Sequence, residues 1–335
     1  MKTLRWGIVG TGGIANMMVP MIRMADASEL HAVSSRRLET AQAFANGHDV
    51  PNAFDSWQEM IDSGVVDAIY VATPTSVREE ICLAAAKAGK HVLGEKPFAS
   101  LPSVERITAA CRDNNVAFMD ATHFVHHPRT LDIKRRREDR LGFVWSVASA
   151  FQFNLEDRGN IRYNPELEPM GAIGDAGWYN MRAAAEYLPP DVVLESASAH
   201  LRRDRETGAA ISGTGVLEFN DGSTSTWNCG FDSGAVVTDL RITGTEGVIN
   251  IDDFLSQNPD GSADFLYRKG GWGDSASDEI NIPSAKPGAA LMFEDMAAAA
   301  ADPSLREQWM TATERTQALL DAAWAAALRS EKDDA

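Results

Sequence analysis

The chain has 335 residues, enough for two domains, and its 44% apolar and 24% charged residues are typical of a globular protein. Its formal net charge of −17 argues against a nucleic-acid partner, because phosphate recognition needs a local excess of lysine and arginine. The basic run Lys134–Arg137 is followed at once by Glu138 and Asp139, so we interpret it as a solvated helix face.

Cysteine usage and hydropathy indicate the compartment. Cys82, Cys111 and Cys229 are odd in number and form no Cys-x-x-Cys pair, which favours reduced, buried thiols. No apolar stretch approaches the ~18 residues that span a bilayer, and a strand pattern at the N-terminus leaves no room for a signal peptide. We therefore expect a cytoplasmic protein with neither a membrane nor a nucleic-acid partner.

The first third of the chain alternates short apolar runs with amphipathic segments, as parallel β–α–β units do. The predicted strands are Leu4–Val9, Leu30–Ser34, Ala68–Ala72, His91–Leu93 and Val116–Met119. The predicted helices are Ile14–Met24, Leu38–Ala45, Val77–Ala88 and Val104–Asn114. Continuous apolar strands indicate that helices cover both sheet faces. Residues 1–121 are thus expected to form a doubly wound Rossmann domain.

After about Asp120, predicted strands follow one another through turns. These strands are Val144–Phe153, Gly215–Phe219, Thr224–Cys229, Val236–Thr243 and Gly247–Ile251. Asn220-Asp221-Gly222 is a hairpin signal between two of them. We also expect helices over Ile173–Tyr187 and Leu305–Leu328, and a long loop over Gln257–Ser277. Residues 122–335 therefore predict an α+β domain with an antiparallel sheet.

A glycine-rich turn links the first predicted strand to the first predicted helix. Gly10–Ala15 matches G-x-G-x-x-A in the context that this motif requires. Gly10 permits the tight turn, Gly12 lets the backbone approach a pyrophosphate, and the helix start supplies N–H donors. The cofactor residues expected here are Gly10, Thr11, Gly12, Gly13 and Ile14. The alternative is a glycine-rich turn that binds nothing.

The end of the second predicted strand bears on the choice between NADP and NAD. An NAD enzyme usually places Asp or Glu there for the ribose hydroxyls, whereas this strand ends in Ser35, Arg36 and Arg37. Arginine offers a charge-assisted fork to a 2′-phosphate that a carboxylate would repel. We expect NADP at these three residues. The alternative is that Arg36 and Arg37 only cap a solvated helix.

Three further stretches carry a recognisable pattern, namely Ala72–Ser76 (Ala-Thr-Pro-Thr-Ser), Ala88–Pro97 (ending Gly-Glu-Lys-Pro) and Gly171–Tyr179 (Gly-Ala-Ile-Gly-Asp-Ala-Gly-Trp-Tyr). In that order and spacing the chain resembles the glucose–fructose oxidoreductase/inositol dehydrogenase (Gfo/Idh/MocA) family over nearly its whole length. The resemblance implies a Rossmann domain followed by a substrate-binding domain with a large open sheet. That sheet commonly joins subunits into homodimers or homotetramers.

The resemblance also implies roles for individual residues. Lys96 matches the family's catalytic lysine, and its bond to Pro97 is expected to be cis. The other cofactor residues expected are Ala72, Thr73, Pro74, Ser76, Glu95, Lys96 and Arg162. The substrate residues expected are His123, Phe153, Arg162 and Trp178. For Arg162 the alternative is a structural ion pair.

Three positions depart from the usual family pattern. Tyr179 stands where many members have His, as in glucose–fructose oxidoreductase, dihydrodiol dehydrogenases and NADP-dependent aldose dehydrogenases. Arg78 replaces the histidine of Thr-Pro-Asn-x-x-His, and Val125 stands where arginine is common. The substrate cannot be copied from the best-known members, and we expect a sugar, a cyclic polyol or a dihydrodiol.

Hydride transfer between a carbinol carbon and nicotinamide needs a group that exchanges the hydroxyl proton. We assign this role to Tyr179. Lowering a phenol pKa from ~10 to ~7 takes about 4 kcal/mol, more than an exposed ion pair supplies. The Lys96 ammonium must therefore act in a water-poor cleft. Asp175 lies one helical turn before Tyr179 on the same face, which suits orienting the substrate or the lysine. The alternatives are a surface lysine, a helix-start carboxylate and a structural tyrosine.

Three other interpretations of the chain remain. His123, His126 and His127 suggest a metal, but zinc needs three or four converging ligands, so we expect none. The chain could instead be a non-catalytic dinucleotide-binding regulator, or a glycosidase that retains NAD and oxidises transiently. The intact Lys96, Asp175 and Tyr179 argue against the regulator. The tyrosine in place of histidine and the preference for NADP argue against the glycosidase.

Overall fold

The computed structural model describes residues 2–273 and 275–333, and contacts divide the chain into two compact units. The first unit runs to His126 and also includes Lys286–Glu314, and the second holds His127–Ala285 and the chain from Arg315 onward. In the described residues no helix combines the length and apolar character that a membrane crossing requires.

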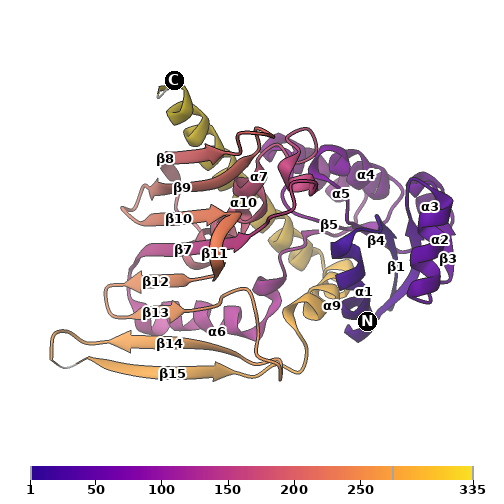
Figure 1. The fold of residues 1–335 in the computed structure, drawn as a ribbon. Helices are drawn as coiled ribbons and strands as arrows, with labels where there is room; N and C mark the ends of the chain where they lie inside the picture. The colour runs from indigo at the N-terminus through magenta and orange to yellow at the C-terminus, as the bar shows by residue number, and fades with distance from the viewer. Residues whose placement is uncertain (1, 274, 334–335) are drawn as a thin grey trace. The chain divides into compact units, whose positions relative to one another are not determined.

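The first unit is built on a six-stranded sheet in which every strand pair is parallel (Figure 1). Its order is β3-β2-β1-β4-β5-β6. The strands are β1 (Leu4–Val9), β2 (Ser28–Ser34), β3 (Asn52–Phe54), β4 (Ala68–Val71), β5 (His91–Gly94) and β6 (Phe118–Asp120). This arrangement confirms the predicted Rossmann domain.

The helices of this unit follow the predicted alternation and add elements that the sequence pattern did not indicate. They are α1 (Gly13–Met24), α2 (Leu38–Gly47), α3 (Trp57–Asp62), α4 (Thr75–Lys87), α5 (Leu101–Asp113), the 3₁₀ turn η1 (His123–His126), α9 (Gly288–Ala301) and the start of α10 (Pro303–Asp333). The strand β4 is buried along its whole length, as its continuous apolar run predicts.

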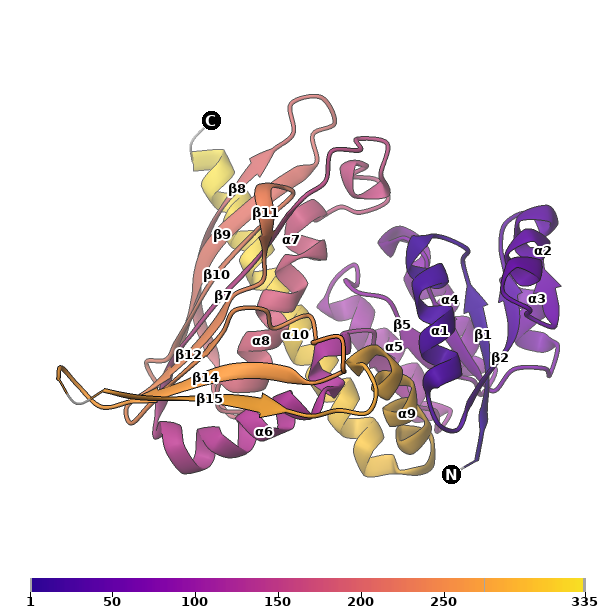
Figure 2. The ribbon, with the colours of Figure 1, turned by 60° about the horizontal axis from the view of Figure 1, so that its bottom comes forward.

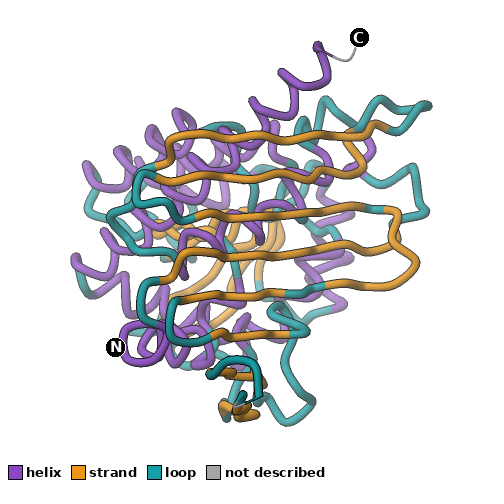
Figure 3. Tube along the Cα trace, turned by 90° about the vertical axis from the view of Figure 1, so that its left-hand side faces the viewer, coloured by secondary structure: helices purple, strands orange, loops and turns teal. Residues whose placement is uncertain are grey.

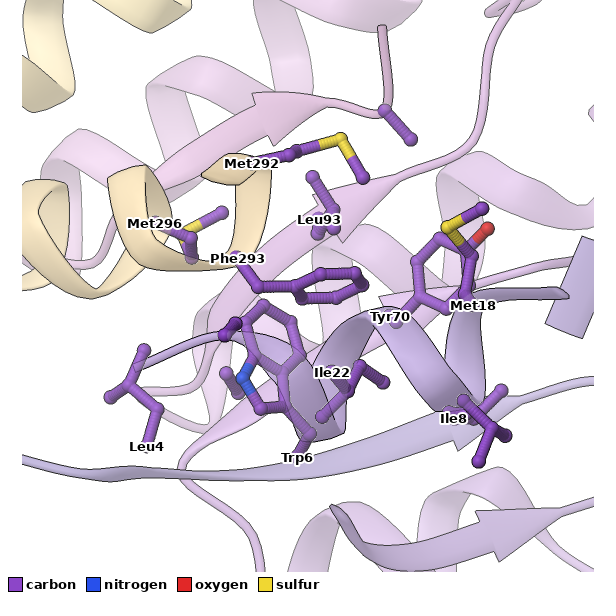
Figure 4. Close-up of a cluster of buried hydrophobic side chains, with 14 of the residues drawn as sticks. Leu4, Trp6, Ile8, Met18, Ile22, Tyr70, Leu93, Met292, Phe293 and Met296 are labelled. Atoms are coloured by element: carbon purple, nitrogen blue, oxygen red, sulfur yellow. The ribbon is translucent and has the colours of Figure 1, made fainter. Parts of the chain in front are cut away.

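Helix α9 joins this core although it lies far along the chain from the sheet. Its Phe293 ring meets Trp6 edge-on at 4.9 Å and lies 6.0 Å from the ring of Tyr70 (Figure 4). Met292 and Met296 are buried beside it. Because α9 is alanine-rich and its burial is spread around the helix, it lacks the polar–apolar contrast by which we recognised the other helices.

The second unit is built on a nine-stranded sheet in the order β15-β14-β13-β12-β7-β10-β9-β8, with β11 paired to β7. The strands are β7 (Val144–Asn154), β8 (Leu194–Arg203), β9 (Ala210–Phe219), β10 (Thr224–Gly230), β11 (Asp232–Val237), β12 (Leu240–Gly244), β13 (Val248–Ile251), β14 (Ala263–Lys269) and β15 (Ala276–Ile282). Only β7 and β10 run parallel among its named pairs, which confirms a mostly antiparallel sheet. The predicted hairpin joins β9 to β10, with Gly222 at a φ of +82°.

Helices cover one face of this sheet and leave the other open. The helical segments of the unit are α6 (Pro128–Arg136), the π-helical turn η2 (Arg137–Leu141), η3 (Ile161–Tyr163), α7 (Gly171–Asp175), α8 (Gly177–Tyr187) and the later part of α10. Helices α7 and α8 pack on β7, β9 and β10 (Figure 2). Figure 3 shows the sheet from its open face, where the strands lie in front of the helices. That face bears a shallow hollow of about 630 Å³, lined in part by Ala148, Thr214, Thr226 and Asn228.

Several predictions for this unit are wrong in detail. The loop expected over Gln257–Ser277 contains β14 and the start of β15. Charged residues within these strands and glycines on both sides of β14 hide the strand pattern. The single strand expected over Val236–Thr243 is split between β11 and β12. The helix expected over Ile173–Tyr187 is interrupted at Ala176, between α7 and α8.

The basic run is not simply a solvated face. Lys134 Nζ lies 2.8 Å from Glu186 Oε2, and Arg136 Nε lies 2.5 Å from Asp132 Oδ2. The run therefore takes part in ion pairs of the second unit. The sequence could not show the first of these, because Lys134 and Glu186 lie on different helices.

Candidate active site

The glycine-rich turn after β1 has the shape that a dinucleotide requires. Gly10 has a φ of +110°, and a Cβ at this position would lie only 2.6 Å from the carbonyl oxygen of Ala72. At Gly12 and Gly13, by contrast, an added Cβ meets nothing within 4 Å. The turn therefore packs tightly against the end of β4 while its other side stays open at the start of α1. This arrangement suits a pyrophosphate on the helix N-terminus.

The tip of β2 presents two exposed arginines. Arg37 is the N-cap residue of α2, and its side chain makes no capping hydrogen bond. Arg36 is likewise exposed, and Ser35 beside it is partly buried. Arg37 therefore occupies the N-cap position, as the alternative expects, but its guanidinium takes no part in the cap.

The segments that follow β4 and β5 carry the other predicted cofactor residues. Thr73 Oγ1 is buried and, in the part of the chain that the structure describes, has no hydrogen-bond partner. Ala72 and Pro74 are partly buried, and Ser76 in the first turn of α4 is exposed. An orphaned buried hydroxyl is costly, so Thr73 fits a position that a ligand completes.

Lys96 follows β5 and is partly exposed, and its peptide bond to Pro97 is cis, which confirms that prediction. The neighbouring Glu95 is buried and accepts a hydrogen bond of 2.5 Å from the hydroxyl of Tyr70. Burial raises the pKa of the Glu95 carboxyl, while the charge of Lys96 and the Tyr70 hydrogen bond oppose this rise. The carboxyl is therefore firmly held beside the candidate lysine.

In the second unit, Asp175 and Arg162 form a two-pronged ion pair. Arg162 Nε donates to Asp175 Oδ2 at 2.7 Å, and Nη2 donates to Oδ1 at 3.1 Å. The Asp175 side chain is only 12% exposed, whereas that of Arg162 is 36% exposed. The ion-pair alternative for Arg162 is therefore realised. Its predicted contacts with cofactor and substrate stay predictions.

Tyr179 lies on α8 against an aromatic cluster. It is 7% exposed, and its ring meets Phe151 of β7 edge-on at 5.4 Å. Phe153, a predicted substrate residue, lies 5.4 Å from Phe151 and 5.3 Å from Phe231. The other predicted substrate residue on α8, Trp178, is fully buried. Lys96 belongs to the first unit and Tyr179 to the second, so the contact between them stays a prediction.

The three histidines do different things. His126 is buried, with Nδ1 2.6 Å from an Asp295 carboxylate oxygen, and His127 Nε2 lies 2.9 Å from the Gly261 carbonyl oxygen. His123 is partly buried in η1, and its substrate role stays a prediction. Among the described residues, no three His, Cys, Asp or Glu side chains gather as metal ligands.

Sequence reasoning missed three residues of this region. The sequence pattern marks Tyr70 only as part of a strand, and Phe151 only as part of an alternating one. Arg78 departs from the family pattern, but the sequence does not predict its contacts with the segments after β4 and β5. A polar residue within a buried strand, as at Tyr70, is the signal that could have been followed.

Comparison with known proteins identifies the family. The family model for oxidoreductases with an NAD-binding Rossmann fold (GFO_IDH_MocA) matches residues 4–122, and that for the GFO/IDH/MocA C-terminal domain matches residues 134–250. A D-xylose 1-dehydrogenase (NADP(+)) of Haloferax volcanii is 31% identical over 271 residues, which cover 80% of this chain and 82% of the relative. The chain belongs to the Gfo/Idh/MocA family.

Another relative of this Gfo/Idh/MocA protein is a dTDP-3,4-didehydro-2,6-dideoxy-alpha-D-glucose 3-reductase of Actinomadura kijaniata. It is 30% identical over 250 residues, which cover 73% of each chain. The solved structure of KijD10, a 3-ketoreductase from Actinomadura kijaniata in complex with NADP and TDP-benzene, shares the fold. Its TM-score is 0.87 at 24% identity, over 97% of this chain and 98% of that one. The protein is an NAD(P)-dependent oxidoreductase that acts on CH–OH or carbonyl groups.

Proposed function

We propose that the protein is an NADP(H)-dependent dehydrogenase or reductase of a sugar, a cyclic polyol or a dihydrodiol-like compound. The observation that carries the proposal is the likeness, over about four-fifths of the chain, to an NADP-dependent D-xylose dehydrogenase. The two exposed arginines at the tip of β2 support NADP, because each offers a fork that suits a 2′-phosphate.

The residues of the first unit would hold the cofactor. The turn Gly10–Ile14 and the start of α1 suit the pyrophosphate, and Ser35–Arg37 suit the adenosine ribose with its phosphate. Thr73 and Glu95 suit the part of the cofactor beyond the pyrophosphate. When bound, the nicotinamide accepts or supplies the hydride.

Tyr179 and Asp175 of the second unit, with Lys96 of the first, would handle the substrate proton. Tyr179 exchanges the proton of the substrate hydroxyl, and the ammonium of Lys96 stabilises its phenolate form. Asp175 orients the substrate, and the two hydrogen bonds from Arg162 fix the direction of that carboxylate. The aromatic rings of Phe151 and Phe153 keep water from the Tyr179 side of the site.

Mass spectrometry of nucleotide that co-purifies with the protein tests the cofactor directly, and NADP(H) is expected. A panel of aldoses, keto-sugars, inositols and dihydrodiols is then assayed by the absorbance of NADPH. At least one member should turn over faster with NADP(H) than with NAD(H). A protein that binds NADPH but oxidises or reduces no panel member would contradict the proposed activity.

Lys96→Met distinguishes an enzyme from a non-catalytic regulator. An enzyme loses turnover while it keeps its cofactor, because the substitution removes the charge and leaves the side chain's length. A regulator would keep both cofactor binding and its response to ligand. A redox-assisted glycosidase would instead release an aglycone from a glycoside without net change in NADPH absorbance.

We also propose that the open face of the nine-stranded sheet joins subunits into a homodimer or homotetramer. Small and polar side chains line the hollow on that face, so a second copy could approach the strands closely. Light scattering with Thr214→Arg and Thr226→Arg tests this. The two added cations should shift the mass toward the monomer, and an unchanged mass would exclude this face as the interface.

A further inference from the structure

Arg78, on the first turns of α4, contacts both segments that carry the predicted residues beyond the glycine-rich turn. Its Nη2 donates to the carbonyl oxygen of Thr73, and its Nη1 donates to the carbonyl oxygen of Pro97. Nη1 also donates to Thr75 Oγ1 at 3.1 Å. One side chain therefore joins the segment after β4 to the segment after β5.

This guanidinium is held on several sides. Arg78 is only 3% exposed, and its Cζ lies 6.0 Å from the centre of the Phe98 ring. Thr75 Oγ1 makes a further link of 3.4 Å to the Pro97 carbonyl oxygen. Burying a cation is costly unless hydrogen bonds offset the cost, so moving either segment would break bonds that stabilise this guanidinium.

The same chain of contacts reaches the phosphate-binding turn. Gly10 lies so close to the carbonyl of Ala72 that a Cβ there would be 2.6 Å from its oxygen. Ala72 precedes Thr73, which accepts from Arg78, and Arg78 in turn donates to the residue after Lys96. The turn thus packs against the segment after β4, and one buried side chain connects that segment to the residue after Lys96.

We propose that Arg78 is a positioning residue of the active site, which fixes the Lys96–Pro97 segment against the Thr73–Pro74 segment and so holds the lysine beside the cofactor cradle. This inference rests on the proposed function. It assigns a role to the position at which the family pattern usually has histidine. A neutral imidazole donates through one nitrogen only, so it cannot hold two carbonyls and a hydroxyl together.

The test compares Arg78→Met with the wild type in three measurements. They are the melting temperature, the affinity for NADPH by fluorescence titration, and the rate at which an acylating reagent modifies Lys96, followed by peptide mass spectrometry with and without NADPH. In the wild type, bound NADPH should shield Lys96. In Arg78→Met, NADPH should still bind, but the shielding of Lys96 should be lost.

Turnover of the best panel substrate gives a fourth measurement. Misplacing a catalytic group by about 1 Å can cost ~100-fold in rate, so kcat should fall by about that factor. The NADPH dissociation constant should rise less than tenfold. Arg106→Met is the matched control, because Arg106 is an exposed arginine of the same unit that pairs with Glu79, and it should leave all four measurements unchanged.

Arg78→Lys covers the case in which Arg78→Met does not fold. It keeps the charge but loses the planar fork, so it should fold and show a partial loss of both shielding and turnover. If either folded variant matches the wild type in shielding and kcat and only melts earlier, Arg78 is merely structural and the inference is refuted. A wild type that binds no NADPH refutes the proposed function itself, and this inference with it.

Discussion

The two units hold their shares of the candidate site in different ways. In the first unit the site residues stand at the ends of parallel strands, and buried hydrogen bonds such as Tyr70 to Glu95 lock them into the sheet. In the second unit Asp175 and Tyr179 stand on short helices that pack on the sheet, held by an ion pair to Arg162 and a ring contact with Phe151.

This difference suggests a division of labour. Strand ends are rigid and bring several backbone groups to one edge, which suits a cofactor that every substrate shares. Helix-borne side chains can be exchanged with less effect on the sheet, which suits recognition of a particular substrate. We therefore expect variants of the glycine-rich turn and of the β2 tip to change cofactor binding, and variants of the second unit to change turnover alone. Lys96 and its support Arg78 are the exceptions in the first unit, because they act on the chemical step.

Tyr179→Phe should have the largest effect. It removes the hydroxyl and keeps the ring against Phe151, so turnover should fall by about 10³-fold, within the range of general acid–base catalysis. The NADPH dissociation constant should not change. Steady-state kinetics and fluorescence titration measure the two quantities.

Tyr187→Phe is the control on the same helix. The Tyr187 hydroxyl donates a hydrogen bond to Thr130 Oγ1, and Tyr187 has no role in the proposed site. Turnover should therefore stay as in the wild type. If Tyr179→Phe weakened NADPH binding as much as turnover, the division between the units would be wrong.

Gly10→Ala should act on the first unit. The added methyl group would need a φ of +110° and would stand 2.6 Å from the Ala72 carbonyl oxygen, so the turn must move. We expect a loss of about 2–3 kcal/mol in unfolding free energy together with a marked loss of NADPH affinity.

Gly64→Ala separates backbone strain from the clash. Gly64 has a φ of +72°, but an added Cβ there meets nothing within 4 Å. It should cost about 1 kcal/mol and leave NADPH affinity intact. Equal affinities in the two variants would show that the turn after β1 is not the cradle.

Arg36→Glu should reverse the preference between cofactors. A carboxylate at the tip of β2 repels a 2′-phosphate and can accept from ribose hydroxyls instead, so NADPH affinity should fall about tenfold to hundredfold. NADH affinity should not fall. Arg23→Glu is the control, because it makes the same change of charge at the exposed C-terminal end of α1. If it lowered NADPH affinity as much as Arg36→Glu does, the effect would come from long-range electrostatics and not from contact with the 2′-phosphate.

Much of the first unit could be predicted because its signals are local. The turn Gly10–Ala15 lies between a strand and a helix that the apolar pattern predicts. The cis bond before Pro97 was implied only by the family resemblance that the Glu-Lys-Pro motif carries. The link from Arg78 to Pro97 could not be predicted. It depends on how α4 and the segment after β5 pack, and no spacing in the sequence encodes that.

The second unit was harder to predict for a physical reason. In the sheet, the central strand β7 pairs with β10, β11 and β12, all far along the chain, so its partners are not its neighbours in sequence. The break at Ala176, which separates Asp175 from the helix of Tyr179, lies between Gly174 and Gly177. Glycine is a poor helix former, but the apolar spacing across this segment still favoured one continuous helix. The residue types of this half could be named, but their supporting contacts could not.

His91 should give the smallest effect and tests how tightly the first unit is built. At the start of β5 its Nδ1 accepts a hydrogen bond of 2.9 Å from the Ala117 N–H, which requires the neutral ring. Burial, and then the positive charge of Arg306, lower the pKa of His91 to about 4. In the unfolded chain the pKa is about 6.5, so between these values the unfolded state binds more protons and stability falls as the pH falls.

Unfolding free energies from urea titrations at about pH 7.5 and about pH 5 should differ by about 1–2 kcal/mol more in the wild type than in His91→Gln. Glutamine can accept from the same N–H through its amide oxygen but does not titrate, so it removes only the pH-dependent part. Asp67 also titrates near His91, but its pKa is lowered by Arg5 and it stays ionised across this window in both proteins. If the unfolding free energy changed equally between the two pH values in both proteins, β5 would tolerate a charged ring. The strand that leads to Lys96 would then be looser than its hydrogen bonds indicate.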